Sequence, residues 1–599
     1  MRGFVILLAG SYVFGLAASA CVPDVPRNLI YEKEVLEHEA VVQALQDVQQ
    51  YLSEKYTSGT TRDGLSVAIV HASSPIPIYT FNNGTLKFND TTPYQGSHDN
   101  IVTSDSIFRI NSITKTLAVT SALVVSQKLR KMSADGLSEL TLDSPIRRLL
   151  PSFALQPLDW ADGGSGITLR MLASHTAGIP RESYSTDFNM LLGASKADAE
   201  TIGARWAGQS AEVLIEGIAR KGLMFRPGER AAYSNAGIGL LGAAVAAYYS
   251  NITGSSLPWS DLATQELLVP LDMTHSFFGI VPQHLIPHLS IPGGENWADL
   301  IVGEGYDPAA GMWSSANDLA SYLYKIWLAP EPELVTTFQR RDVLRPSISI
   351  PDSVQQTGPG WEIGLRYVST NDNMSSATKT LKQYSIFGKP GGGGGWKSWI
   401  DNVPNLGYGI VILAQQSGLK HYEGIDPGAL QDDMHSTLLP AFAKALGDRT
   451  RDRYAGRYTV GKDEGLITDQ VDTAKNKTVT YAQLEIQDQI LYLRSLVVEG
   501  KSVLEAIDRL FWTADAQPVF FSRPQGAVLE PADGAAETAQ FGPTAQVWRM
   551  SLPGDQCNWQ DFDGVQDNNG WPLTKVVTVT DGDRVELHYP PFNIVAARI

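Results

Sequence analysis

The sequence predicts two domains of different classes: an α/β domain with an all-helical lobe, followed by a mostly β domain. The length of 599 residues is the first reason, because one hydrophobic core rarely serves more than roughly 250–300 residues. Periodicity is the second reason. Long helical patterns and apolar runs dominate before about residue 450, and short alternating runs dominate after it. We therefore expect domains over 21–448 and 449–599.

The first twenty residues are typical of a secretory signal peptide. Arg2 supplies the positive charge, an apolar run extends to Leu16, and residues 18–20 are small enough for a cleavage site. We expect residues 1–20 to be removed and the protein to be secreted and extracellular. A bacterial lipoprotein start at Cys21 is the alternative, although Ala18 stands where such a signal usually has leucine.

Two further features suit an extracellular protein. Cys21 and Cys557 are the two cysteines of the chain, and an isolated pair tends to join in an oxidising compartment. We expect a disulfide between them, with two unrelated thiols as the alternative. The N-x-[ST] sequons that would accept glycans are Asn83, Asn89, Asn251, Asn373 and Asn476.

The net charge of −17 argues against nucleic acid or an anionic membrane as partner. No apolar run after the signal peptide is long enough to span a bilayer. The histidines show no metal-ligand spacing. A small molecule or a short peptide is the expected partner, and the oligomeric state stays open.

In the first domain, apolar spacing predicts each element in turn. The expected helices cover about 35–56, 112–129, a short segment ending near Pro151, 167–180, 236–249, a segment following 309–315, and 428–446. The expected strands are 65–70, 78–81 and 408–413, and residues 387–391 begin a glycine-rich strand.

In the second domain, short alternating runs predict strands. These runs are 479–481, 491–493, 519–521, 546–550 and 576–579. Asp581-Gly582 is a typical hairpin turn before a last run at 585–587.

Ser112 and Lys115 stand at the start of the second predicted helix. Residues i and i+3 share one helix face, roughly 5–6 Å apart at Cβ, so the two side chains can share a proton. Serine needs such a neighbour to act as a nucleophile. Free N–H groups in the first helical turn also favour a developing negative charge. The alternative is an N-cap serine followed by a surface lysine.

Two later stretches supply the other parts of an acyl-transfer site. Tyr233 and Lys115 are candidate proton acceptors, but a pKa near 10 must fall by about three units for that role. Lys115 and Lys389 are the cations that would lower the pKa of Tyr233. The glycines after Lys389 let a substrate approach backbone N–H groups that could hold an oxyanion.

The motifs Ser112-Ile113-Thr114-Lys115, Tyr233-Ser234-Asn235 and Lys389-Pro390-Gly391 resemble those of the serine β-lactamase and penicillin-binding-protein superfamily. The tyrosine motif is similar to that of class C β-lactamases, D-alanyl-D-alanine carboxypeptidases and related esterases. The resemblance covers about 35–445 and is strongest to secreted fungal β-lactamase-like proteins. It implies a β-lactamase/transpeptidase-like fold with Ser112 at the junction of an α/β lobe and an all-helical lobe.

The resemblance also implies a role for each residue. Ser112 becomes acylated, Tyr233 with Lys115 moves the proton, and the N–H groups of Ser112 and Gly392 hold the oxyanion. His175 belongs to a structural turn. No metal or organic cofactor is implied. The substrate-binding residues would be Asn235, Lys389, Gly391 and Gly392.

Pro390 departs from the family pattern, because β-lactam-active members usually have a hydroxyl residue there. The departure favours ester, amide or thioester substrates. The C-terminal region resembles the lipocalin-like or small barrel domains of some members.

We therefore expect a serine hydrolase that acts through an acyl-serine on an ester, amide or β-lactam. One alternative is an acyltransferase of secondary metabolism with the same acyl-serine. The other is a non-catalytic binding protein on this scaffold.

Overall fold

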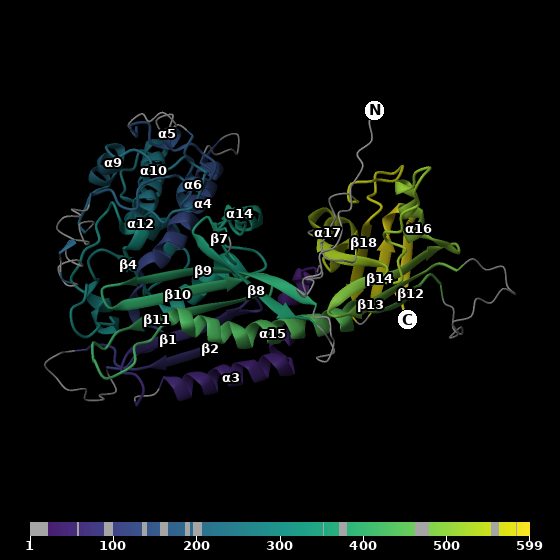
Figure 1. Cartoon of the computed structure of the whole chain (residues 1–599), viewed down its shortest axis with the longest axis horizontal. Helices are drawn as coiled ribbons and strands as arrows, with labels where there is room; N and C mark the ends of the chain where they lie inside the picture. The colour runs from purple at the N-terminus through teal and green to yellow at the C-terminus, as the bar shows by residue number, and fades with distance from the viewer. Residues whose placement is uncertain are drawn as a thin grey trace. The chain divides into compact units, whose positions relative to one another are not determined.

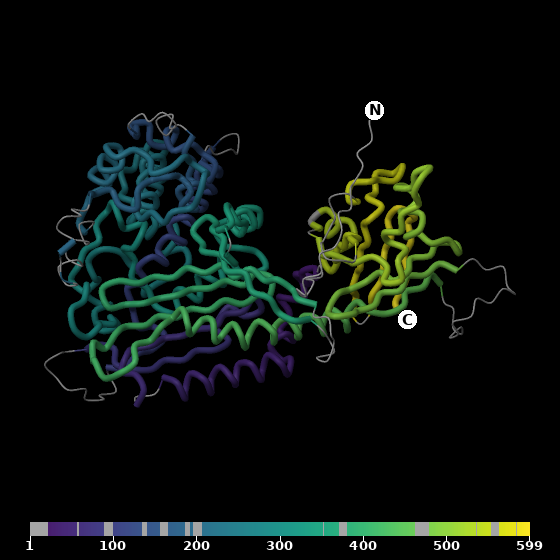
Figure 2. The backbone as a smooth tube through the Cα atoms, in the orientation of Figure 1, coloured from purple at the N-terminus to yellow at the C-terminus, as the bar shows by residue number. Residues whose placement is uncertain are grey.

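A computed structural model provides the structure of the chain (Figure 1). It describes residues 22–56, 59–88, 100–133, 140–155, 166–185, 192–193, 195, 207–351, 353–370, 380–461, 479–532, 534–552, 562–582 and 584–599. These fall into two compact units. One comprises 30–366 and 384–442, and the other comprises the N-terminal segment up to residue 29, 367–383 and 443–599. Figure 2 traces the backbone of each.

The first unit is built on an antiparallel sheet with the strand order β2-β1-β11-β10-β9-β8-β7-β6. Its central strands are buried along their whole length because both faces are covered. The strands are β1 (Gly64–His71), β2 (Ser74–Asn83), β6 (Ile348–Ser349), β7 (Gln355–Gly358), β8 (Trp361–Ser369), β9 (Leu381–Gly393), β10 (Trp396–Val403) and β11 (Tyr408–Gln415).

The two edges of this sheet differ from its centre. Edge strand β2 contains Pro75 and Pro77, which have no N–H to donate. The register of β2 against β1 also shifts between Ile69 and His71. At the opposite edge, β6 is two residues long.

Helices cover the sheet. α3 (Glu39–Lys55) buries one stripe at helical spacing, Val41, Ala44, Val48 and Leu52. It lies beside α15 (Pro427–Tyr454), where the Tyr51 hydroxyl donates to Asp433 and Lys55 Nζ lies 3.2 Å from the same carboxylate (Figure 1).

A second group of helices surrounds α4 (Thr114–Met132), which is buried from Thr114 through Ser126. α10 (Asn235–Thr253) packs closely against the segment containing α12 (Asp307–Ala310), since a Cβ added at Gly242 would lie 2.3 Å from Pro308 Cγ. Among the described residues, this unit also contains α2 (Glu34–Glu37), α5 (Ile146–Leu149), α6 (Leu169–Ala173), α9 (Ala211–Ala219), α11 (Trp259–Ala263), α13 (Ala316–Tyr322) and α14 (Thr337–Val343), and the last residue of α1 (Arg27–Ile30) belongs to it.

A small sheet with the strand order β3-β5-β4 joins three distant segments of the chain. It consists of β3 (Ile107–Arg109), β5 (Met312–Ser315) and β4 (Phe277–Phe278). β3 delivers the chain into the turn that carries Ser112.

The second unit contains a closed barrel. Its sheet runs β13-β12-β20-β19-β18-β17-β16-β14, β13 and β14 pair to close it, and β15 adds to β14. The elements are β12 (Gly456–Thr459), β13 (Tyr481–Gln487), β14 (Ile490–Val498), β15 (Lys501–Ser502), β16 (Ala527–Ala532), β17 (Ala545–Ser551), β18 (Lys575–Asp581), β19 (Arg584–Tyr589) and β20 (Ile594–Arg598), with α16 (Val503–Asp508) and α17 (Ala535–Phe541).

The predicted mostly β C-terminal region is thus confirmed, including the hairpin at Gly582, where Asp581 pairs with Arg584. The predicted strand at 519–521 is wrong. The backbone N–H of Phe521 donates to the buried Asp508 carboxylate at 2.8 Å, and the ring packs on Phe562, so this segment is an aromatic loop.

Two predictions in the first unit need correction. The helix expected over 167–180 is limited to α6, because His175 and Gly178 take left-handed backbone angles and end it. Residues 312–315, expected only to lead into a helix, form β5. None of the helices within the described ranges is long and apolar enough to cross a membrane.

Candidate active site

Ser112 lies in a 3₁₀ turn, Asn111–Ile113, directly before α4. Asn111 has φ of 48°, a left-handed angle that asparagine tolerates better than most residues. This bend turns the chain from β3 into the helix. Ser112 thus lies two residues before the buried helix, whereas the sequence predicted it in the first turn of that helix.

Lys115 is fully buried, and its Nζ donates to Ser112 Oγ at 2.9 Å and to the Ala309 carbonyl at 2.8 Å. Ala309 belongs to α12, which α10 holds in place. Burial lowers the pKa of Lys115 from its usual value, nearby Tyr233 opposes the shift, and Lys389 adds to it. A lysine in this environment can lose its proton and accept another.

Tyr233 donates its hydroxyl hydrogen to Ser112 Oγ at 2.7 Å. Burial opposes ionisation of the phenol, but the charges of Lys115 and Lys389 prevail and lower its pKa to about 8. Their ammonium groups lie 4.8 and 5.1 Å from the centre of the Tyr233 ring. The ring also packs against His175 in a tilted arrangement, with 4.6 Å between centroids and 36° between the ring planes.

His175 supports this arrangement. Its Nδ1 accepts the backbone N–H of Ser234 at 3.2 Å. Burial, Lys115 and Lys389 hold its pKa well below the usual value, so the imidazole is neutral. The imidazole therefore packs beside Tyr233 and accepts a hydrogen bond from the backbone of the next residue.

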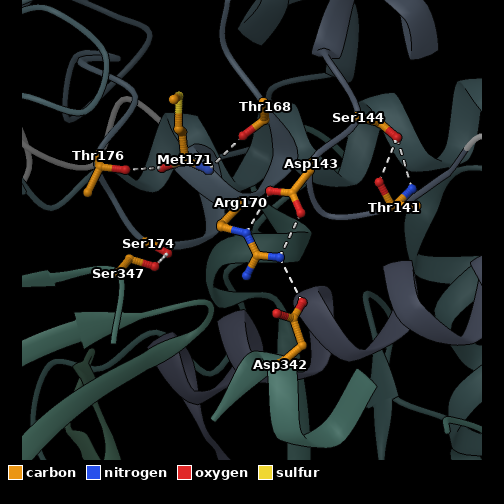
Figure 3. Close-up of polar contacts among 10 residues, drawn as sticks. All are labelled: Thr141, Asp143, Ser144, Thr168, Arg170, Met171, Ser174, Thr176, Asp342 and Ser347. Atoms are coloured by element: carbon orange, nitrogen blue, oxygen red, sulfur yellow. Dashed lines mark hydrogen bonds and ion pairs between the residues drawn. The ribbon is translucent and has the colours of Figure 1, made fainter. Parts of the chain in front are cut away.

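The helix before His175 is anchored by an arginine with two carboxylate partners (Figure 3). Arg170 binds Asp143 through two nitrogens at 2.7 and 2.9 Å, and it binds Asp342 at 2.7 Å. Ser174 and Ser347 hydroxyls meet at 2.8 Å, which ties the following turn to the β-sheet region (Figure 3).

Asn235 begins α10, and Ser234 caps that helix by accepting from the Gly237 N–H at 2.8 Å. The amide nitrogen of Asn235 donates to Glu182 Oε1 at 2.7 Å. Glu182 Oε2 is buried and has no partner. Burial raises the pKa of Glu182, and the hydrogen bond from Asn235 and the charge of Arg181 oppose that shift.

Lys389 lies on β9 and has 2% of its side chain exposed. Its Nζ donates to Glu362 Oε1 on β8 at 2.6 Å and to the Pro390 carbonyl at 3.1 Å. Glu362 is 46% exposed. The lysine predicted to face the substrate is therefore already paired with a carboxylate of the chain.

Gly391 and Gly392, both predicted to bind substrate, differ in the space that surrounds them. A Cβ added at Gly391 would lie 2.2 Å from the Ile110 carbonyl, so only glycine lets β9 approach the segment before Ser112. A Cβ added at Gly392 would meet nothing closer than 3.9 Å. The oxyanion role of the Ser112 and Gly392 N–H groups stays a prediction.

The structure thus brings together the predicted residues from three separate stretches of the chain. Sequence reasoning missed Glu182 and Glu362, and it missed Arg181, whose guanidinium lies 5.0 Å from the Tyr233 ring centre. The signal for the first was the Arg-Glu pair directly after the 175–180 turn. For Glu362 it was a polar residue between two apolar ones in a strand.

The predicted modification sites lie partly outside the described residues. Cys21, Cys557, Asn89, Asn373 and Asn476 fall there, as does the predicted signal peptide. Asn251 is exposed on α10. Asn83 is half-buried, and its side chain donates to the Tyr56 carbonyl.

Comparison with known proteins agrees with this geometry. The model of the Beta-lactamase family matches residues 52–432, more than half of the chain. The chain has a β-lactamase/transpeptidase-like fold with a C-terminal barrel, as its resemblance to the superfamily and to the C-terminal domains of some members implied. The chain belongs to the beta-lactamase family, whose characterised members are serine hydrolases.

Three relatives illustrate how similar the chain is to known proteins and how much of each chain the similarity covers. A beta-lactamase-like protein of Arthroderma benhamiae is 25% identical over 488 residues, 74% of each chain. The D-alanyl-D-alanine-carboxypeptidase/endopeptidase AmpH of Escherichia coli is 24% identical over 339 residues, 54% of this chain and 74% of that one. Beta-lactamase-like protein 2 of Dictyostelium discoideum is 26% identical over 266 residues, and the match spans 44% of this chain and 43% of that relative.

Proposed function

We propose that the protein is a secreted serine hydrolase that forms and hydrolyses an acyl-serine at Ser112, with an ester, amide or β-lactam as substrate. The observation that carries this proposal is the convergence of Lys115 Nζ and the Tyr233 hydroxyl on Ser112 Oγ, at 2.9 and 2.7 Å. Both lie within the reach that proton transfer requires.

The two steps follow from this arrangement. Loss of the Tyr233 proton reverses the hydrogen bond, so that Ser112 donates to the phenolate. Ser112 Oγ then attacks the carbonyl carbon as its proton passes to Tyr233, and the leaving group takes that proton as the carbonyl re-forms. Water repeats the sequence on the acyl-serine and regenerates the free hydroxyl.

Two observations bear on the substrate range. The relative AmpH of Escherichia coli is a D-alanyl-D-alanine-carboxypeptidase/endopeptidase. Pro390 supplies no hydroxyl beside Lys389, and this favours esters and amides over the substrates of that relative.

Intact mass after brief incubation tests the proposal. The panel is a chromogenic cephalosporin, a D-Ala-D-Ala peptide and short-chain activated esters. We expect a mass increment equal to one acyl group on the wild type and none on Ser112→Ala, with melting temperatures within a few degrees of each other. Turnover by Ser112→Ala equal to wild type would end the proposal. Adding an alcohol or amine acceptor distinguishes hydrolysis from acyl transfer.

Secretion is a separate part of the proposal. It is supported by the N-terminal sequence pattern and by an exposed sequon at Asn251. Expression in a eukaryotic host should give medium-borne protein whose mass falls on treatment with an N-glycosidase. Retention inside the cells without glycan would contradict it.

A further inference from the structure

The side chains predicted to bind substrate are both occupied by carboxylates of the chain itself. Asn235 donates to Glu182 at 2.7 Å, and Lys389 donates to Glu362 at 2.6 Å. Sequence motifs alone present Asn235 and Lys389 as free donors. In the structure, each of them donates a hydrogen bond to a carboxylate from another segment of the chain.

The Lys389–Glu362 pair changes what this end of the site offers to a ligand. An ammonium has three donor hydrogens, and two of those of Lys389 are directed at Glu362 and the Pro390 carbonyl. The lysine is 2% exposed, whereas Glu362 is 46% exposed. The charge that solvent meets here is therefore the negative one.

An anionic ligand would have to displace or approach that carboxylate. Like charges within a few ångströms repel at a partly solvated site. Pro390 provides no hydroxyl to compensate. Arg181, an exposed cation near Tyr233, lies 3.8 Å from the Glu182 carboxylate, so its charge is also partly neutralised.

We infer that the site selects uncharged or cationic acyl donors over anionic ones, and that Glu362 is the residue that sets this preference. The inference rests on the proposed acyl-serine function and names its substrate class. Glu362 is a specificity-determining residue that acts by pairing with Lys389.

Three aryl acetates that differ in one charged group test the preference: 3-acetoxybenzoate, 3-acetoxybenzamide and 3-(trimethylammonio)phenyl acetate. Each kcat/KM is divided by the spontaneous hydrolysis rate of the same ester. We expect the wild type to use the neutral and cationic esters better than the anionic one. Glu362→Gln should raise the anionic value by about tenfold and lower the cationic one comparably, because one nearby charge is removed. The neutral value should stay within about twofold, and added salt should reduce the differences.

Two control variants keep the test interpretable. Glu216→Gln removes a carboxylate that pairs with Arg220 on an exposed face of α9 and should change none of the three ratios. Glu362→Asp keeps the charge and should keep the wild-type order. A preference of the wild type for the anionic ester would overturn the inference. So would an equal effect of Glu362→Gln on all three esters, because that would indicate a structural role alone.

Binding to Ser112→Ala separates this inference from the proposed function. Titration calorimetry with the three acetates should give the same charge order without turnover. If that order holds while the wild type turns over none of them, the inference stands and the hydrolase proposal fails. If the wild type turns them over with the anionic ester preferred, the hydrolase proposal stands and the inference fails.

Discussion

The helical side and the strand side of the candidate site each place a buried lysine beside Tyr233, yet the two lysines have different partners. Lys115, on α4, contacts a hydroxyl and a carbonyl, 2.9 and 2.8 Å away. Lys389, on β9, contacts the Glu362 carboxylate at 2.6 Å. Burial lowers the pKa of Lys115, whereas the Glu362 carboxylate offsets the charge of Lys389. The same residue type therefore meets neutral acceptors on one side of the candidate site and a carboxylate on the other.

Replacing each lysine by methionine should separate the two roles most strongly. Lys115→Met should lower kcat/KM by about 10³-fold, because it removes both a hydrogen bond to Ser112 and a cation that lowers the pKa of the base Tyr233. Lys389→Met should lower it by roughly 10-fold, because that lysine acts on Tyr233 only through its charge. Steady-state kinetics on a neutral ester would measure both values, with melting curves to establish folding. Equal losses of kcat/KM in the two variants would show that the two lysines do not have different roles.

Tyr233→Phe should have the next largest effect, a fall of about 10²-fold. The pKa of Tyr233 is lowered to about 8, so kcat/KM of the wild type should rise as the pH passes that value and the phenolate forms. The ring of phenylalanine keeps the contact with His175 and the contacts with both lysines, so the fold should be unchanged.

The pH profile of each variant sharpens this result. Tyr233→Phe should lack the limb near pH 8, and Lys389→Met should move it upward because one of the cations that lower the pKa of Tyr233 is gone. An unchanged limb in Tyr233→Phe would assign it to another group.

Arg170 offers the smallest effect and a contrast to both lysines. It is a cation with two carboxylate partners, Asp143 and Asp342 (Figure 3). Arg170→Met should lower the free energy of unfolding by about 1 kcal/mol, since Asp143 is largely exposed. The pH limb near 8 should not move.

The pH dependence of stability and a matched variant both test whether Arg170 stabilises the fold through its ion pairs. The Arg170 hydrogen bond holds the pKa of Asp143 below its usual 3.8. Its stabilisation is therefore present above about pH 4 and is lost as the pH falls further. The stability difference between wild type and Arg170→Met should shrink there. Arg220→Met, which removes an exposed i,i+4 pair, should cost less than about 0.5 kcal/mol.

Local patterns predicted much of this molecule. The spacing of Ser112 and Lys115 sets their shared helix face, and alternation identified β14, β17 and β18. Long-range pairing was beyond such patterns. Glu182 and Asn235 are 53 residues apart, and Glu362 and Lys389 are 27 apart on neighbouring strands.

The wrong strand at 519–521 has the same origin. Its alternation satisfies the strand pattern, but the Asp508 carboxylate, from α16, accepts the N–H groups of Phe521 and Ser522. Those N–H groups would otherwise be available to a ladder. A single buried acceptor from another segment outweighed the local propensity.

The prolines of β2 have a consequence for the protein at high concentration. An open sheet presents an edge to which a strand of another molecule can add, and such additions seed aggregates. Pro75 and Pro77 remove donors from one edge, and the register shift of β2 twists it. The opposite edge, β6, is too short to guide an incoming strand. The barrel closes its own ring through β13 and β14. The two units therefore limit strand addition in different ways. The open sheet of the first unit has edge strands that pair poorly, and the sheet of the second unit closes because its strands β13 and β14 pair with each other.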